Sequence, residues 1–121
     1  MLNTKNEYKE YSFYILVEKH NNKSKALKIG MTTNFKNRLR KIRFEEKKEY
    51  IIIDTVTMYC NKSKALFIES CLRQTMDKVK GFEHYGNDYF DTNCNKVKDI
   101  VNKIETLDTI INKANSIINL L

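Results

Sequence analysis

The stretch KIGMTTNFKNRLRKI, residues 28–42, joins a strand to a basic helix and decides the fold. The apolar start and Gly30 indicate the end of a strand, and Thr33 or Asn34 can cap the helix that follows. The apolar residues of this helix fall on one face at helical spacing: Phe35, Leu39 and Ile42.

Positive charge is concentrated in this part of the chain. Residues 28–48 hold eight basic residues against Glu45 and Glu46, a balance of +6 within a net charge of +7 for all 121 residues. A cationic helix attracts polyanions, because neutralised phosphates release their counterions. A lysine-rich solvated face with no partner is the alternative interpretation.

Outward from the opening stretch, the pattern predicts an α/β (α+β) fold in one compact domain. We expect a small three-stranded, mainly antiparallel sheet flanked by helices. The predicted elements are strands over 11–19, 26–31 and 50–59, helices beginning after Asn34 and over 64–79, capped by Ser63, a short strand over 88–92 and a helix over 95–120.

The last predicted helix has an apolar seam, a line of apolar residues along one side of the helix. Val97, Ile100, Ile104, Leu107 and Ile111 continue a spacing of three and four residues that is typical of a coiled coil. We therefore divide the chain into a domain over 1–94 and a C-terminal helix over 95–121, which either docks on the domain or forms a homodimer through 97–121. Extra apolar positions favour the docked arrangement.

Two polar residues lean toward apolar helix faces. Glu69 lies at the margin of the apolar face of the helix over 64–79, and Arg38 flanks the apolar face of the preceding helix. A carboxylate placed in this way needs a cation, a hydrogen-bond donor or a metal as its partner. Without further information, a structural ion pair between the two helices explains both residues.

The ordered segments FYILV, LKIGMTTNFKNRLRKI, ALFIESCLR and GNDYFD resemble the GIY-YIG nuclease superfamily, in particular its viral, phage and fungal branch with KIG as the second motif. The resemblance covers roughly residues 11–92. It implies a metal-dependent endonuclease that hydrolyses DNA and belongs to a virus, a phage or a mobile element. The site residues that it implies are Tyr14, Lys28, Gly30 as the motif glycine, Arg38, Glu69 and Asn87.

The resemblance also implies a role for each of these side chains. Glu69 would hold Mg²⁺ or Mn²⁺, and Arg38 would hold the scissile phosphate by its planar fork of donors. Tyr14 would orient or deprotonate the attacking water, which requires a more acidic phenol. Lys28, which replaces a tyrosine of the second motif, is placed to supply the necessary positive charge. Outside this site we expect four basic residues to bind the DNA backbone: Lys36, Arg40, Lys41 and Arg43.

Two other functions remain open for the same sequence. The first is an inactive or weakly active nucleic-acid-binding module, and the second is a protein-interaction subunit that acts through its last helix. Cys60, Cys71 and Cys94 lack the spacing of a zinc site and are expected to be reduced thiols. Without a long apolar run, we expect a protein of the cytoplasm, or of the host cytoplasm or nucleus if viral, with no membrane partner.

Overall fold

The computed structural model describes residues 7–19, 25–86 and 88–120. Its five strands form one antiparallel sheet in the order β3-β1-β2-β5-β4. The elements, in chain order, are β1 (Tyr8–Glu18), β2 (Ala26–Thr32), α1 (Phe35–Glu46), β3 (Tyr50–Asn61), α2 (Lys62–Asp77), β4 (Phe82–Tyr85), β5 (Tyr89–Thr92), α3 (Val97–Lys103) and α4 (Leu107–Leu120).

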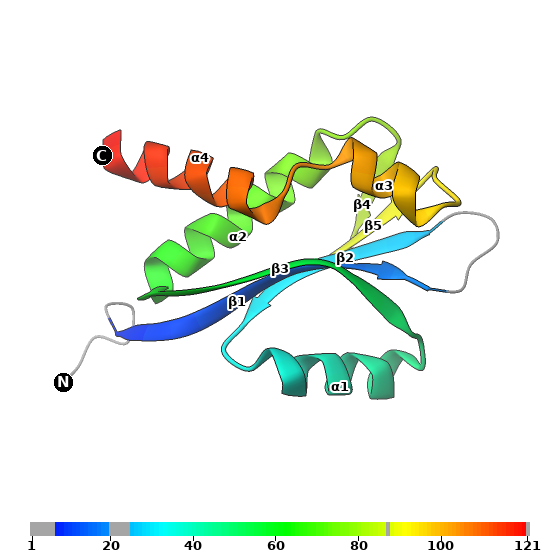
Figure 1. Cartoon of the computed structure of the whole chain (residues 1–121), viewed down its shortest axis with the longest axis horizontal. Helices are drawn as coiled ribbons and strands as arrows, with labels where there is room; N and C mark the ends of the chain where they lie inside the picture. The colour runs from blue at the N-terminus through cyan, green and yellow to red at the C-terminus, as the bar shows by residue number, and fades with distance from the viewer. Residues whose placement is uncertain (1–6, 20–24, 87, 121) are drawn as a thin grey trace.

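The helices cover the two faces of the sheet unequally. Helix α1 lies on one face, whereas α2, α3 and α4 lie on the other (Figure 1). The residues of β1 alternate between these faces, so that Phe13 and Ile15 enter the large core under α2 and α4, and Tyr14 and Leu16 enter the small core under α1. The chain therefore has one extensive aliphatic core and one smaller, more polar one.

The α/β (α+β) class is confirmed, but the expected number of strands is wrong. The structure adds a hairpin of β4 and β5, of which only β5 overlaps the short strand expected over 88–92. Strand β4 has the sequence FEHY, in which only Phe82 is buried, so four residues give too little alternation to indicate a strand. Its partner in the hairpin and the aromatic stacking of His84 on Phe90 stabilise it instead.

Asparagine side chains start the first two helices. Asn34, one of the two expected caps, accepts a hydrogen bond from the backbone N–H of Asn37 at 3.2 Å. Helix α2 begins earlier than expected, because Asn61 rather than Ser63 caps it and accepts from the N–H of Lys64 at 2.8 Å. Both caps satisfy N–H groups that lack a partner within the helix.

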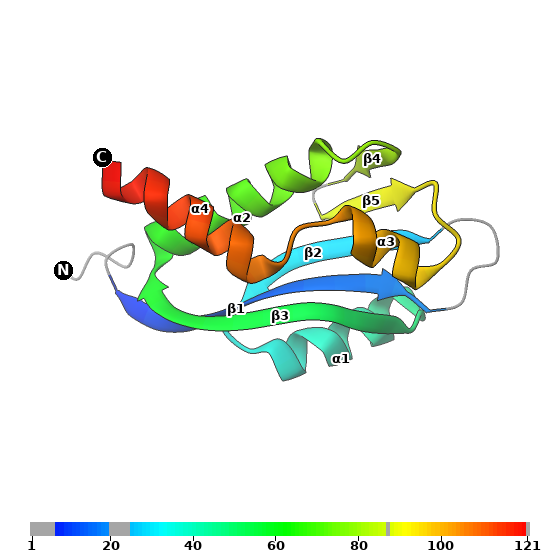
Figure 2. The ribbon, with the colours of Figure 1, turned by 45° about the horizontal axis from the view of Figure 1, so that its top comes forward.

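The prediction of one uninterrupted helix over 95–120 is wrong. The backbone becomes extended at Ile104, and a second helix begins at Leu107. The side chain of Thr106 accepts from the N–H of Thr109 at 3.2 Å, and Asp54 of β3 accepts from the N–H of Leu107 at 2.8 Å. These two caps fix the start of α4, which lies beside α2 (Figure 2). Most of the seam is buried in the chain's own core: Ile100, Leu107, Ile111 and Ala114.

No helix in the described ranges has the length and apolar character needed to span a membrane.

Candidate functional site

Gly30 is needed because the side chain of Tyr14 packs directly against it. Tyr14 of β1 and Gly30 of β2 are direct partners in the antiparallel register. A Cβ atom at position 30 would lie 2.6 Å from Cζ of Tyr14, which is closer than real Cβ contacts allow. The phenol ring is buried in this way, and its centroid is 5.5 Å from that of Phe35 at the start of α1. The glycine therefore makes room for Tyr14 rather than only ending the strand.

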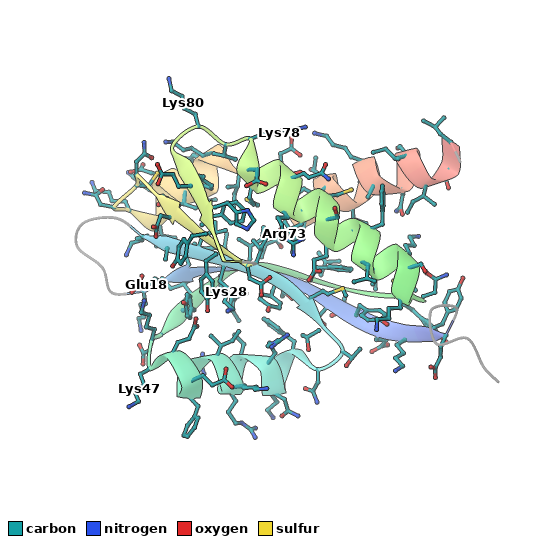
Figure 3. The ribbon with its side chains drawn as sticks, turned by 180° about the vertical axis from the view of Figure 1, so that it is seen from behind. Glu18, Lys28, Lys47, Arg73, Lys78 and Lys80 are labelled. Atoms are coloured by element: carbon teal, nitrogen blue, oxygen red, sulfur yellow. The ribbon has the colours of Figure 1, made fainter. Side chains whose placement is uncertain are left out.

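Lys28 is buried beside the same part of β2, on the α1 side of the sheet (Figure 3). Its ammonium donates to the Tyr89 hydroxyl at 2.6 Å, lies 3.9 Å from the centre of that ring and forms an ion pair with Glu46 at 3.7 Å. Burial lowers the pKa of Lys28, against which the charges of Glu46 and Asp88 act. The lysine thus belongs to a buried polar cluster at the end of α1.

The edge of β2 opens where its pairing with β5 ends. The last paired residues are Lys28 and Tyr89, followed by one hydrogen bond of 3.0 Å from the N–H of Ile29 to the carbonyl of Asp88. Farther along β2, the N–H of Met31 donates to the carboxylate of Glu69 on α2. Glu69 thus occupies the place that the neighbouring strand leaves free, and Asp88 lies at its side.

Arg73 joins the two carboxylates at this edge. Its guanidinium is 3.7 Å from Glu69, one turn earlier on α2, and 3.8 Å from Asp88. Burial raises the pKa of Glu69, the charge of Arg73 opposes the rise, and Asp88 adds to it. Figure 3 shows Arg73 and Lys28 between α1 and α2. The edge therefore brings alternating positive and negative groups to one place.

Arg38 faces this edge from α1. Its side chain is exposed, yet its charge lowers the pKa of both Tyr14 and Glu69. Because such effects need proximity, its guanidinium lies near both groups. The structure therefore brings four of the predicted site residues into one electrostatic environment, together with the unforeseen Asp88: Tyr14, Lys28, Arg38 and Glu69.

The prediction that the phenol of Tyr14 is unusually acidic is wrong. Burial raises the pKa of Tyr14 to about 12, and the charges of Asp88, Glu69 and Glu46 add to the effect of burial, whereas only Arg38 opposes it. The ammonium that was expected to acidify the phenol is held instead by Tyr89 and Glu46. Tyr14 is therefore a neutral phenol at physiological pH.

Sequence reasoning missed the acidic partner of Lys28. One carboxylate oxygen of Glu46, Oε2, is buried without a hydrogen-bond partner in the described part of the chain. The pKa of Tyr50 is raised by burial and by both the charge of Glu46 and a hydrogen bond to it. The available signal was position, because Glu46 follows Arg38 and Ile42 at intervals of four and shares their helix face.

The four residues expected to bind the DNA backbone are all exposed on α1. Lys36, Arg40 and Arg43 lie along one side of the helix, while Lys41 lies closer to Arg38 and pairs with Glu45 at 3.9 Å. They form a cationic surface beside the site. The predicted site residue Asn87 lies outside the described residues.

Comparison with known proteins gives one match. The sequence model described as the T5orf172 domain matches residues 11–105. The chain belongs to the T5orf172 domain family. This family differs from the GIY-YIG superfamily, so the expected membership is wrong. T5orf172 domains are nuclease-like, DNA-binding domains. No curated protein and no solved structure matches the chain.

The T5orf172 match spans every side chain of the candidate site, from Tyr14 to Tyr89, and continues through α3. It therefore crosses the boundary that was expected at residue 94. In the described part of this chain, no group of three or more histidine, cysteine, aspartate or glutamate side chains is arranged to hold a metal. Its cysteines are free thiols, of which Cys60 and Cys94 are buried.

Proposed function

We propose that the chain is a metal-dependent endonuclease that hydrolyses DNA phosphodiester bonds at the open edge of β2. The observation that carries this proposal is the gathering of Tyr14, Arg38, Glu69 and Asp88 at one edge of a nuclease-like, DNA-binding domain. Phosphodiester hydrolysis needs positive charge at the phosphoryl oxygens and a positioned water. These side chains offer groups for both tasks.

The basic residues divide into two sets in this proposal. Arg38 is exposed at the site and can bind a phosphate through two parallel hydrogen bonds from its guanidinium. Arg73 already holds two carboxylates and would move between them and the phosphate when DNA binds. The exposed basic residues of α1, such as Arg40 and Arg43, would bind the DNA backbone beyond the cleaved bond.

The carboxylates suit a divalent cation that keeps most of its water. Glu69 and Asp88 both lie close to the same nitrogen of Arg73, Nη2, so they would supply two oxygen ligands at the site. Mg²⁺ is commonly bound by one or two carboxylates together with waters and substrate phosphates, and Mn²⁺ accepts similar ligands. When bound, such an ion neutralises charge on the phosphate and leaving oxygen and makes a coordinated water more acidic.

Tyr14 is suited to orienting the water rather than deprotonating it. With a pKa of about 12, its phenol keeps its proton and can donate a hydrogen bond at neutral pH. The position of the ring is fixed by Gly30 below it and by Phe35 beside it. A fixed donor next to the phosphate limits the orientations of the attacking water, which lowers the entropic cost of reaction.

The proposal is tested by plasmid relaxation with Mg²⁺, with Mn²⁺ and with a chelator. Glu69→Gln and Arg38→Ala should each lower the rate by about 100-fold, as expected for loss of a charged group at a transition state. Glu83→Gln, on the exposed part of β4, and Lys98→Ala, at an exposed position of α3 outside the proposed DNA-binding surface, are the matched controls. If Glu69→Gln and Arg38→Ala cut as fast as the parent, the assigned site is wrong.

A binding module without turnover is the second function to be distinguished, and the exposed basic side of α1 favours it. Fluorescence anisotropy with duplex DNA, single-stranded DNA and RNA at several salt concentrations measures binding separately from cleavage. Neutralising Arg40, Lys41 and Arg43 together should weaken binding and reduce its salt dependence. Binding by the parent without any metal-dependent cleavage would favour this second function.

A further inference from the structure

A cavity of about 700 Å³ lies between α2 and α4, away from the candidate nuclease site. Cys71 and Thr75 line it from α2, Lys78 follows directly after that helix, and Ile110, Ala114 and Ile117 line it from α4. Glu69 and Arg73 of α2 contact groups at the edge of β2 instead. The two sites therefore use different sides of α2 and can bind different molecules.

The cavity combines an apolar floor with a cationic rim. Val79, Ile110, Ala114 and Ile117 supply the floor. Four lysines and a single glutamate are its charged lining residues, which leaves three positive charges in excess: Lys78, Lys80, Lys103, Lys113 and Glu105. A water-filled surface hollow needs no such apolar floor, and a purely apolar groove needs no lysine rim.

Two of these lysines are held in place by specific contacts. Lys103 donates to Oδ1 of Asn93 at 3.2 Å, and Lys113 pairs with Glu105 at 2.6 Å. The side chain of Asn93 packs closely against Gly81, which has a φ of +91°. A Cβ atom at position 81 would lie only 2.6 Å from Cγ of Asn93, so this packing requires a glycine. The wall that carries Lys103 is therefore built by the local backbone.

The other two lysines are available to a ligand. Lys78 and Lys80 are exposed at the end of α2 and in the turn that follows it (Figure 3). Within the described ranges, neither forms an ion pair or a side-chain hydrogen bond. An anionic group at the rim would gain contacts with two ammonium groups without displacing a protein carboxylate.

We propose that this cavity binds a small organic anion with an apolar body and one carboxylate, sulfonate or phosphate group. Its volume lies within the range of about 300 to 1,000 Å³ that is usual for small-molecule sites. Its described lining has no aromatic side chain, whereas single-stranded nucleic acid is commonly bound by stacking on aromatic rings. The body of the anion would lie on Val79, Ile110 and Ile117, and its charge would face Lys78 and Lys80.

The test titrates the full chain with two fluorescent probes of nearly the same shape. The first is 8-anilinonaphthalene-1-sulfonate, an organic anion, and the second is its uncharged counterpart, N-phenyl-1-naphthylamine. The anion should bind about tenfold more tightly than the neutral probe, because only the anion can use the lysine rim. Equal affinities would overturn the proposal.

Matched variants locate the bound probe. Lys78→Gln/Lys80→Gln should remove most of the preference for the anion, whereas the exposed pair Lys96→Gln/Lys98→Gln, which has the same change in charge, should keep it. Ile117→Glu should weaken both probes, and because Ile117 is 46% exposed this variant should fold normally. A preference that survives Lys78→Gln/Lys80→Gln, or affinities unchanged in Ile117→Glu, would place the probe elsewhere and refute the assignment.

A competition experiment separates this cavity from the DNA-binding surface. A duplex of about 20 base pairs, which covers roughly two turns of DNA, should leave bound 8-anilinonaphthalene-1-sulfonate in place. Displacement of the probe by the duplex would overturn the proposal, since the cavity would then belong to the nucleic-acid surface. The result does not depend on whether the chain cleaves DNA.

Discussion

The two faces of the sheet differ in what they bury. The face under α2 and α4 buries aliphatic side chains such as Ile15, Ile68 and Leu72. The face under α1 buries a tyrosine and a lysine, Tyr14 and Lys28, next to a carboxylate oxygen that has no hydrogen-bond partner among the described residues. Apolar burial stabilises a fold, whereas buried polar groups cost free energy unless they are paired. The comparison indicates that apolar burial stabilises the fold mainly on the face under α2 and α4, whereas the α1 face and the neighbouring edge of β2 hold the polar groups of the candidate site.

The largest expected effect comes from making the same leucine-to-alanine substitution on each face, which tests directly whether the two faces stabilise the fold unequally. Leu72 of α2 is fully buried, whereas Leu39 of α1 is partly buried against the smaller core. Leu72→Ala should lower the free energy of unfolding by about 3 kcal/mol, and Leu39→Ala by about 1 kcal/mol. Urea denaturation followed by circular dichroism measures both values. Equal losses would show that the α1 face stabilises the fold as strongly as the other.

The next prediction concerns the close fit of Gly30 under Tyr14. Gly30→Ala should lower the free energy of unfolding by about 2 kcal/mol, because the new Cβ would overlap the phenol ring. In a Tyr14→Leu background, which removes the overlapping atoms, the same change should cost less than about 0.5 kcal/mol. A double-mutant cycle in urea measures the difference. Full additivity of the two changes would mean that Gly30 is needed for a reason other than the ring.

The sequence predicted the elements whose signal is local. β-Branched residues in the stretch from Tyr50 to Tyr59 and the apolar face of α1 needed no tertiary information, and β3 and α1 lie where they were expected. The break before α4 was missed because one of its caps, Asp54, comes from a strand 53 residues earlier in the chain. Short-range patterns cannot show such a partner.

The candidate site was partly predictable for the same reason. Tyr14 and Arg38 stand in segments with clear strand and helix patterns, so their faces followed from periodicity. Asp88 lies in the turn before β5, and its place beside Glu69 depends on where the pairing of β2 with β5 ends. The pKa of Tyr14 depends on burial by distant elements, and charge counting along the chain therefore gave the wrong direction.

The smallest expected effect is a change in stability at Glu69. It distinguishes a carboxylate needed for DNA cleavage from one that only stabilises the fold through its contact with Arg73. The pKa of Glu69 is raised in the folded chain above its ordinary value, mainly by burial, so the folded state binds this proton more tightly than the unfolded state. Stability therefore falls as the pH rises from the ordinary pKa of a glutamate through the higher folded pKa of Glu69, and the cost is complete above the folded pKa. Glu69→Gln, which has no charge, should increase the free energy of unfolding at pH 7.

This gain should fade as the pH falls toward about 4, where the carboxyl group of the parent is largely protonated in the folded chain. Loss of the contact with Arg73 offsets the gain by less than about 1 kcal/mol, since the pair is partly exposed. Urea denaturation at both pH values, with Glu83→Gln on the exposed part of β4 as the control, measures the difference. A variant that is more stable than the parent at pH 7 and yet does not cleave DNA would assign the carboxylate to chemistry, whereas a loss of stability at pH 7 would make Glu69 a structural partner of Arg73.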